Sequence, residues 1–414
     1  MTSVTAARAT PRVASAALGL WLLGCTGEGA DLEATGGSSA GGDTNATSGS
    51  TGASPSGSAS SSSAGSTGSG PIQPDCSDPP SAAPGAAWEN VTGNLAGIES
   101  ECGNLTIVVA TPCSPQVVAG VALKGLWATI DGGQSWAPLG TAPSSATITN
   151  RPSSIVHDPE DPDAFWVSGI YNGAGIFKSS DVGTTFEQLG EIGHNDLVSV
   201  DFTDPDRNTL LAGGHEQKQT LYRSTDGGQS WTDVGDNLPA TAHFSSYPLV
   251  LDAQTHLVGA CGWGDGTCGI WRTTDGGASW DEVSDLPAQA APLWASDGAI
   301  YWPLGDGALA KSTDAGASFT RLDEPIAAVT PVELPDGRLV SFREGRLAVS
   351  SDGALSWSPI GEPLPFQPAG LTYSAATLSF YIWHWDCGEV VLPDAIQRAG
   401  FDYAANRARS TERK

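Results

Sequence analysis

Short runs of apolar and β-branched residues alternate with polar turns along most of the chain. Residues 153–158 read SSIVHD, residues 164–171 read AFWVSGIY, and residues 175–181 read GIFKSSD. A shorter run follows the third one, as in SWTDVG at 230–235. Runs of this length, bounded by Gly, Asp, Asn and Pro, are typical of β-strands joined by tight turns. The pattern therefore predicts groups of four antiparallel strands, which we name A to D in chain order.

One polar phrase recurs between strands C and D. It reads STDGGQSW at 224–231, and further copies lie at 129–136, 179–186, 273–280, 312–319 and 350–357. The aspartates of successive copies are 50, 45, 49, 39 and 38 residues apart. Periods of this length indicate the blades of a β-propeller.

The residue types of this phrase suit a tight turn. Asp, Ser and Thr side chains hydrogen-bond to nearby backbone groups, Gly adopts a positive φ, and an aromatic ring covers the hairpin with apolar area. None of these roles needs a ligand, so we interpret the phrase as structural. The sixth copy has Gly353 one place early, so the pattern does not define its turn. The residues assigned this role are Asp131, Gly133, Trp136, Asp181, Gly183, Phe186, Asp226, Gly228, Trp231, Asp275, Gly277, Trp280, Asp314, Gly316, Phe319, Asp352 and Trp357.

The phrase resembles the Asp box, or BNR repeat, of sialidases, xyloglucan hydrolases, sortilin-type receptors and photosystem assembly factors. The resemblance covers the repeats and implies a sialidase-like propeller whose boxes lie opposite the active site. It does not extend to the sialidase catalytic parts, because the aromatic-Arg-Ile-Pro motif is absent around Arg151. The arginine triad of that family is not recognisable either: Arg223 and Arg272 belong to the repeat, and Arg343 and Arg346 come from one hairpin.

A seventh blade lacks the phrase. Residues 369–394 supply strands A, B and C, and AAWENVTGNL, from Ala86, resembles the D strands SWDEVSDL and SWTDVGDNL. We therefore predict an all-β, seven-bladed propeller of four-stranded blades over residues 76–395. An N-terminal strand completes the last blade and leaves few exposed edges.

The N-terminus resembles that of a bacterial lipoprotein. Arg8 and Arg12 precede an apolar run that is too short to span a bilayer, so residues 1–24 read as a secretory signal. The sequence Leu-Leu-Gly-Cys ending at Cys25 resembles a lipobox, which implies acylation of Cys25; the alternative is an ordinary signal peptide with a chance cysteine. Thr26 in place of Asp favours the outer membrane of a Gram-negative bacterium over the inner one.

The segments outside the propeller are polar. Residues 25–75 consist mostly of Gly, Ser, Ala and Thr and predict a disordered tether, with a reach of roughly 40 Å. Residues 396–414 read as a polar tail. The formal net charge of −27 argues against binding to a phosphate backbone, so we expect no nucleic-acid partner. We expect a monomer held to the membrane by its lipid anchor.

The six cysteines that remain fit disulfide bonds in an oxidising compartment. We call the face with the A–B and C–D turns the lower face, and the face with the B–C and D–A loops the upper face. Placing the cysteines on these faces favours the pairs Cys102–Cys387, Cys76–Cys113 and Cys261–Cys268. A bond between Cys102 and Cys113 would have to span an extended strand, which exceeds disulfide reach.

Candidate binding residues lie on the upper face. Tyr and Trp beside polar groups suit the recognition of a sugar or a peptide. The expected ligand contacts are Trp263, Tyr171, His194, His215, Arg343 and Trp385. Tyr247 and Trp383 lie nearby. The alternative interpretation is that Trp383 and Trp385 pack one face into the blade core.

The upper-face residues also allow two other chemistries. A glycoside hydrolase needs two converging carboxylates, and the upper-face acids are Asp196, Glu216, Asp265, Asp306, Glu344 and Asp386. A metal site needs converging ligands, and the upper-face histidines are His194, His215, His243 and His384. Loop acids and histidines are more often solvated, so we predict neither a metal nor a cofactor. The expected function is a non-catalytic binding or scaffold module for a protein or glycan, with a two-carboxylate glycoside hydrolase as the alternative.

Overall fold

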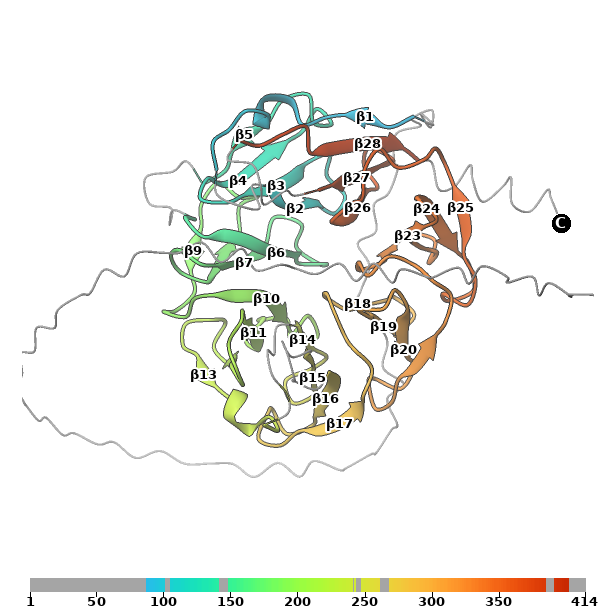
Figure 1. Ribbon diagram of the computed structural model, residues 1–414. Coiled ribbons are helices and arrows are strands. Elements are labelled where there is room, and N and C mark those ends of the chain that lie inside the picture. The colour runs from blue at the N-terminus through green and yellow to red at the C-terminus, as the bar shows by residue number, and fades with distance from the viewer. Residues whose placement is uncertain are drawn as a thin grey trace, which may run out of the picture. The chain divides into compact units, whose positions relative to one another are not determined.

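A computed structural model describes residues 87–100, 105–140, 148–240, 242, 247–260, 268–384 and 391–401. These residues form seven four-stranded antiparallel sheets, which follow one another around a ring (Figure 1). The chain is therefore an all-β, seven-bladed propeller, which confirms the prediction from the repeat.

Each blade uses its strands in the order A to D. Blade 1 contains β2 (Leu105–Ala110), β3 (Val117–Val121), β4 (Gly125–Thr129) and β5 (Ala137–Pro138). Blade 2 contains β6 (Arg151–His157), β7 (Phe165–Ile170), β8 (Ile176–Ser179) and β9 (Glu187–Gln188). Blade 3 contains β10 (Asn195–Val200), β11 (Leu210–Gly214), β12 (Leu221–Ser224) and β13 (Thr232–Asp233). Blade 4 contains β14 (Tyr247–Val250), β15 (His256–Ala260), β16 (Gly269–Thr273) and β17 (Asp281–Ser284). Blade 5 contains β18 (Leu293–Trp294), β19 (Ile300–Pro303), β20 (Leu309–Ser312) and β21 (Thr320–Leu322). Blade 6 contains β22 (Val332–Glu333), β23 (Leu339–Arg343), β24 (Arg346–Ser350) and β25 (Ser358–Ile360). Blade 7 contains β26 (Gly370–Ser374), β27 (Ser379–Trp383), β28 (Ile396–Gly400) and β1 (Glu89–Asn90). Short 3-10 turns follow β1 (Gly93–Leu95) and β13 (Gly235–Asn237).

The apolar core lies between the blades. Among the described residues there are seven apolar clusters, and each joins two neighbouring blades around the ring. Strand B is covered on both of its faces, so β3, β7, β11, β15 and β27 are buried throughout. This explains why these strands read as continuous apolar runs without alternation.

The ring closes between the two ends of the propeller. Glu89 and Asn90 of β1 pair with Arg398 and Gln397 of β28, and the two strands lie side by side in Figure 1. The buried Thr92 hydroxyl then accepts two backbone N–H groups, those of residues 395 and 396, at 2.9 Å each. Closure by an N-terminal strand is confirmed.

Strand C of the seventh blade differs from the sequence prediction. The pattern places it within 369–394, whereas the structure places it at Ile396–Gly400, inside the segment predicted as a tail. Ile396 and Ala399 face the core, while Gln397 and Arg398 between them are half-buried. Two apolar side chains among polar ones give a weak strand signal. The residues from 402 onward lie outside the described part of the chain.

The six repeat turns share one hydrogen-bond pattern. In each copy the Asp accepts the hydroxyl of the first Ser or Thr at 2.7–2.9 Å and the backbone N–H four residues later at 2.8–3.0 Å. Two consecutive residues after the Asp have positive φ. The sixth copy keeps this geometry although Ala354, at φ 68°, occupies the second of these positions. Its shifted glycine therefore leaves the turn unchanged.

The aromatic residue of the repeat contacts the preceding blade. The indole N–H of Trp136 donates to the Val91 carbonyl at 3.0 Å, and that of Trp231 donates to the Leu189 carbonyl at 3.0 Å. The side chain of Asn94 also bonds the Trp136 backbone N–H and carbonyl at 2.7 and 2.9 Å. Repeat turns thus join one blade to the next as well as closing their own hairpins.

Only two of the cysteines fall in the described segments. Cys113 and Cys268 each take part in a disulfide bond. Cys25, Cys76, Cys102, Cys261 and Cys387 lie outside the described residues, so the three pairings and the acylation remain predictions.

None of the helical segments in the described ranges is long and apolar enough to cross a membrane.

Candidate functional site

Five of the polar upper-face residues meet at the loops of blades 2 and 3. We call Tyr171, His194, Asp196, His215 and Glu216 the upper-face cluster. Tyr171 follows β7 in a B–C turn, His194 ends the loop before β10, Asp196 lies in β10, and His215 and Glu216 follow β11. The rings of Tyr171, His194 and His215 are 4.9–5.2 Å apart, centroid to centroid. Three sequence candidates for ligand contact are therefore brought together.

His215 is held on both sides of its ring. Its Nδ1 lies 2.7 Å from Asp196 Oδ1, and its Nε2 lies 3.1 Å from the Tyr171 hydroxyl. Glu216 Oε1 lies 3.7 Å from the same Nε2. Because an ionised carboxylate can only accept, Nδ1 carries a proton and donates it to Asp196. In the neutral ring Nε2 is then unprotonated and accepts the Tyr171 O–H.

His194 is fixed by the backbone of the same tyrosine. The Tyr171 N–H donates to His194 Nδ1 at 3.0 Å, and the His194 carbonyl accepts the His215 N–H at 2.8 Å. Burial first, and then the neighbouring His215, lowers the pKa of His194. His194 is therefore neutral at physiological pH, with an unprotonated Nδ1.

Left-handed backbone occurs at three positions of the cluster. Tyr171, His194 and Glu216 have φ values of 60°, 63° and 52°. The B–C turns of blades 1 and 6 also contain left-handed residues, Leu123 and Glu344. The conformation at Tyr171 and Glu216 thus belongs to the hairpin turn, whereas His194 lies in a D–A loop. Such strain accompanies functional sites, but here the turn type explains most of it.

Most of the remaining upper-face candidates lie on other blades. Arg343 pairs with Glu324 and lies 3.6 Å from Glu344, and Asp306 lies 2.7 Å from Arg321. These pairs belong to blades 5 and 6, where each of these acids lies beside an arginine. Arg151 of blade 2 is nearer, because its guanidinium lies 5.9 Å from the centre of the Tyr171 ring.

Three further candidates pack into the propeller. Trp383 is 7% exposed and belongs to the apolar cluster between blades 7 and 1, so it is a core residue, as the alternative interpretation stated. Burial raises the pKa of Tyr247, which packs against the core between blades 4 and 5. The ring of His384 lies 4.5 Å from that of Phe366. Trp263, Trp385, His243, Asp265 and Asp386 lie outside the described residues.

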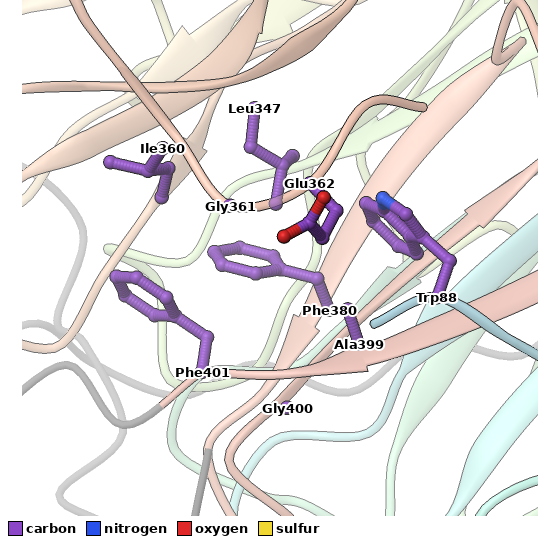
Figure 2. A pocket seen from close by; sticks show the side chains of 9 residues that line it. All are labelled: Trp88, Leu347, Ile360, Gly361, Glu362, Phe380, Ala399, Gly400 and Phe401. Atoms are coloured by element: carbon purple, nitrogen blue, oxygen red, sulfur yellow. The ribbon is translucent and has the colours of Figure 1, made fainter. Parts of the chain in front are cut away.

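A small hollow opens between blades 6 and 7. Figure 2 shows Trp88, Phe380 and Phe401 around it, with the Glu362 carboxylate between the rings of Phe380 and Trp88. Its volume of about 40 Å³ holds a few water molecules but no sugar ring. The hollow is therefore a packing gap rather than a ligand site.

The lower face contains a buried ion pair that sequence reasoning did not identify. Arg207 bonds Asp158 through two nitrogens at 2.8 and 2.9 Å, and Glu160 at 2.8 Å. The Arg207 and Asp158 side chains are 8% and 5% exposed. The order of the strands places Arg207 in an A–B turn but does not identify its partner. The signal was available, because the turns DPEDPDA at 158–164 and TDPDRNT at 203–209 occupy equivalent places in neighbouring blades.

Comparison with known proteins supports the fold. The chain is similar to the extracellular domain of a hybrid two-component system protein from B. thetaiotaomicron, with 13% identity and a TM-score of 0.54 over 75% of this chain and 41% of that one. It is also similar to U3-55K, with 11% identity and a TM-score of 0.52 over 77% of this chain and the whole of that one. A GH74 xyloglucanase from Xanthomonas campestris gives 20% identity and a TM-score of 0.48.

The chain spans little more than half the length of the GH74 enzymes that it matches. It covers 53% of the Xanthomonas campestris chain, over 75% of its own length, and 56% of the Niastella koreensis enzyme. No protein-family model and no curated protein sequence matches the chain. The likeness to the two structures with TM-scores above 0.5 supports the β-propeller fold alone.

Proposed function

We propose that this chain is an extracytoplasmic binding or scaffold module that recognises a protein or glycan through the upper-face cluster. This proposal rests mainly on the convergence of Tyr171, His194 and His215 from three separate loops. Tyr171 is 37% exposed, so an aromatic ring and its polar neighbours are available to a partner. Amphipathic rings beside fixed polar groups are typical of recognition surfaces.

The lower face supports this assignment by contrast. There the Asp carboxylates already accept hydrogen bonds from their own turns, as when Ser230 bonds both carboxylate oxygens of Asp226. These bonds lower the pKa of Asp226. Such groups are satisfied within the fold and have little to offer a ligand.

The recognition role is tested by binding with matched variants of the purified full chain. Wild type, Tyr171→Ala and Glu187→Ala would be compared on a glycan array and in cross-linking to envelope proteins. Glu187 is an exposed residue of strand D in the same blade and serves as the control. We expect a ligand that wild type and Glu187→Ala retain and Tyr171→Ala loses. Equal binding by all three would contradict recognition at this cluster.

Localisation at the membrane is part of the same proposal. Acylation of Cys25, followed by the tether at 26–75, would hold the propeller at the outer membrane, and the disulfides Cys102–Cys387, Cys76–Cys113 and Cys261–Cys268 suit that compartment. Metabolic labelling with an alkynyl fatty acid tests it. We expect labelled wild type and unlabelled Cys25→Ser, and label that survives in the variant would contradict anchoring at Cys25.

One pair of acids in the cluster bears on the alternative function, a two-carboxylate glycoside hydrolase. Asp196 and Glu216 lie on opposite sides of the His215 ring, at 2.7 and 3.7 Å from its two nitrogens. Each contacts the imidazole, which leaves neither free in the arrangement shown. We therefore expect no reducing-sugar release from a polysaccharide panel. Release by wild type that disappears in both Asp196→Asn and Glu216→Gln would establish the hydrolase instead.

A further inference from the structure

Two imidazole rings and a carboxylate of the upper-face cluster present ligand atoms to one small region. One ring nitrogen each of His194 and His215 and one carboxylate oxygen of Glu216 lie within 4.8 Å of one another. They come from the loop before β10 and from the turn after β11, so two blades contribute. Distances of this size allow a single ion to contact all three once these groups move closer together, because metal–nitrogen and metal–oxygen bonds are about 2 Å long.

His215 already has the orientation of a metal-binding histidine. Its Nδ1–H donates to Asp196 Oδ1 at 2.7 Å, which leaves the Nε2 lone pair for another partner. Metal-ligating histidines almost always make such a bond with their second nitrogen, since it fixes the tautomer and increases the basicity of the ligating atom. Asp196 is therefore a positioning residue and not a ligand.

His194 also has an unprotonated nitrogen. A backbone N–H can only donate, so the 3.0 Å bond from the Tyr171 N–H shows that His194 Nδ1 has a lone pair. Tyr171 thus donates one hydrogen bond to each imidazole. Its N–H bonds His194, and its O–H bonds His215 at 3.1 Å from Nε2. The two donors of one residue occupy the positions that a cation would take.

Ion binding therefore requires Tyr171 to move out of these positions. This residue is 37% exposed and lies at the tip of the blade 2 B–C turn, between β7 and β8. The carboxylates of Asp196 and Glu216 favour a cation in its place, and Arg151 near the Tyr171 ring is the nearby positive charge that opposes it. The two carboxylates outnumber that single guanidinium.

We propose that His194, His215 and Glu216 bind a divalent transition-metal ion, with Asp196 orienting His215. Two imidazoles and one carboxylate suit Zn²⁺, Cu²⁺ or Ni²⁺ rather than Mg²⁺ or Ca²⁺, which prefer oxygen ligands alone. Three protein ligands leave a position for an oxygen or nitrogen atom of a bound partner, as at open zinc sites. That last step rests on the recognition role proposed above, whereas ion binding does not.

Calorimetry with the metal-stripped full chain tests the site in the absence of any glycan or protein. We expect one Zn²⁺ per chain in a background of excess Mg²⁺, which occupies non-specific acidic sites. His215→Gln should weaken binding by more than about 100-fold and Asp196→Asn by about 10–100-fold. His384→Gln removes a histidine on blade 7 and should bind Zn²⁺ as wild type does.

A spectroscopic readout separates ligation from a structural effect. Co²⁺ in place of Zn²⁺ should give visible d–d absorption in wild type that is lost in His215→Gln, while thermal unfolding of the two metal-free proteins stays the same. Asp196→Glu should restore part of the affinity that Asp196→Asn loses. Zn²⁺ affinity that is equal in wild type and His215→Gln, or absent up to millimolar Zn²⁺ in wild type, would overturn the site.

Discussion

The two faces of this propeller use similar polar residues for different ends. On the lower face, carboxylates are committed to the fold: each repeat-turn Asp bonds within its own hairpin, and Asp158 is buried against Arg207. On the upper face, the carboxylates of Asp196 and Glu216 contact a histidine that is linked to an exposed tyrosine. The difference teaches that the polar groups of the regular repeat stabilise their own turns, whereas the irregular ones of the upper face gather around an exposed tyrosine.

The largest expected effect comes from breaking the buried lower-face ion pair. Arg207→Ala leaves Asp158 charged and buried, so we expect a loss of about 3–5 kcal/mol in unfolding free energy. Arg343→Ala is the matched upper-face change, because its partners Glu324 and Glu344 are 42% and 72% exposed. It should cost about 1 kcal/mol or less. Urea unfolding of both variants measures the difference, and equal costs would contradict the contrast between the faces.

Acid should destabilise the protein through a half-buried histidine near the lower face, whose two ring nitrogens are enclosed. Burial lowers the pKa of His157, at the end of β6, from 6.5 to about 4. The pKa of His157 is lower in the folded state than in the unfolded state. Its contribution to the unfolding free energy is therefore complete above pH 6.5 and is lost as the pH falls toward 4. Between pH 7 and pH 4.5 this amounts to about 2 kcal/mol.

His157→Phe isolates that contribution. We expect the fall in unfolding free energy between pH 7 and pH 4.5 to be smaller in the variant by that amount. Part of the fall should remain, because burial also lowers the pKa of His256 to about 4. A pH dependence identical to that of wild type would show that His157 titrates normally.

The smallest effect concerns contact between a repeat turn and the preceding blade. Gly228 has φ 93°, and a Cβ at this position would lie 2.8 Å from Leu189 Cδ1 of blade 2. Gly337, at φ 80°, has nothing within 4 Å of the equivalent atom, so Gly337→Ala reports backbone strain alone. Gly228→Ala should cost about 1 kcal/mol more than Gly337→Ala in thermal or urea unfolding. A difference near zero would mean that Leu189 moves aside freely.

The fold was largely predictable because its signal repeats. Six copies of one phrase mark the C–D turns, and the D strand after Ala86 could be recognised by its likeness to the others. Strand C of blade 7 was not found because IQRAG contains polar residues and lacks the phrase. Ala354 shows the converse: a letter that departs from the pattern can still adopt the required φ, at 68°.

The site was predictable only as a set of separate candidates. Tyr171, His194 and His215 could be placed on the upper face from the order of the strands. Their meeting depends on three loop conformations and on the directions of the side chains, none of which follows from strand periodicity. The pairing of Asp196 with His215 across 19 residues is of the same kind. Arg207 and Asp158 differ, since equivalent turns one repeat apart offered a signal.

Closure by β1 also sets the time at which the ring can be completed during synthesis. Glu89 lies 309 residues ahead of Arg398, its partner across the seam. At about 5–20 residues per second, roughly 15–60 s separate the synthesis of the two strands. Blades 1 to 6 can form from neighbouring hairpins in that interval, while β1 has no strand to pair with. The last strand made therefore times the final step of folding, and a chain that stops before Ile396 would carry six blades and an open ring.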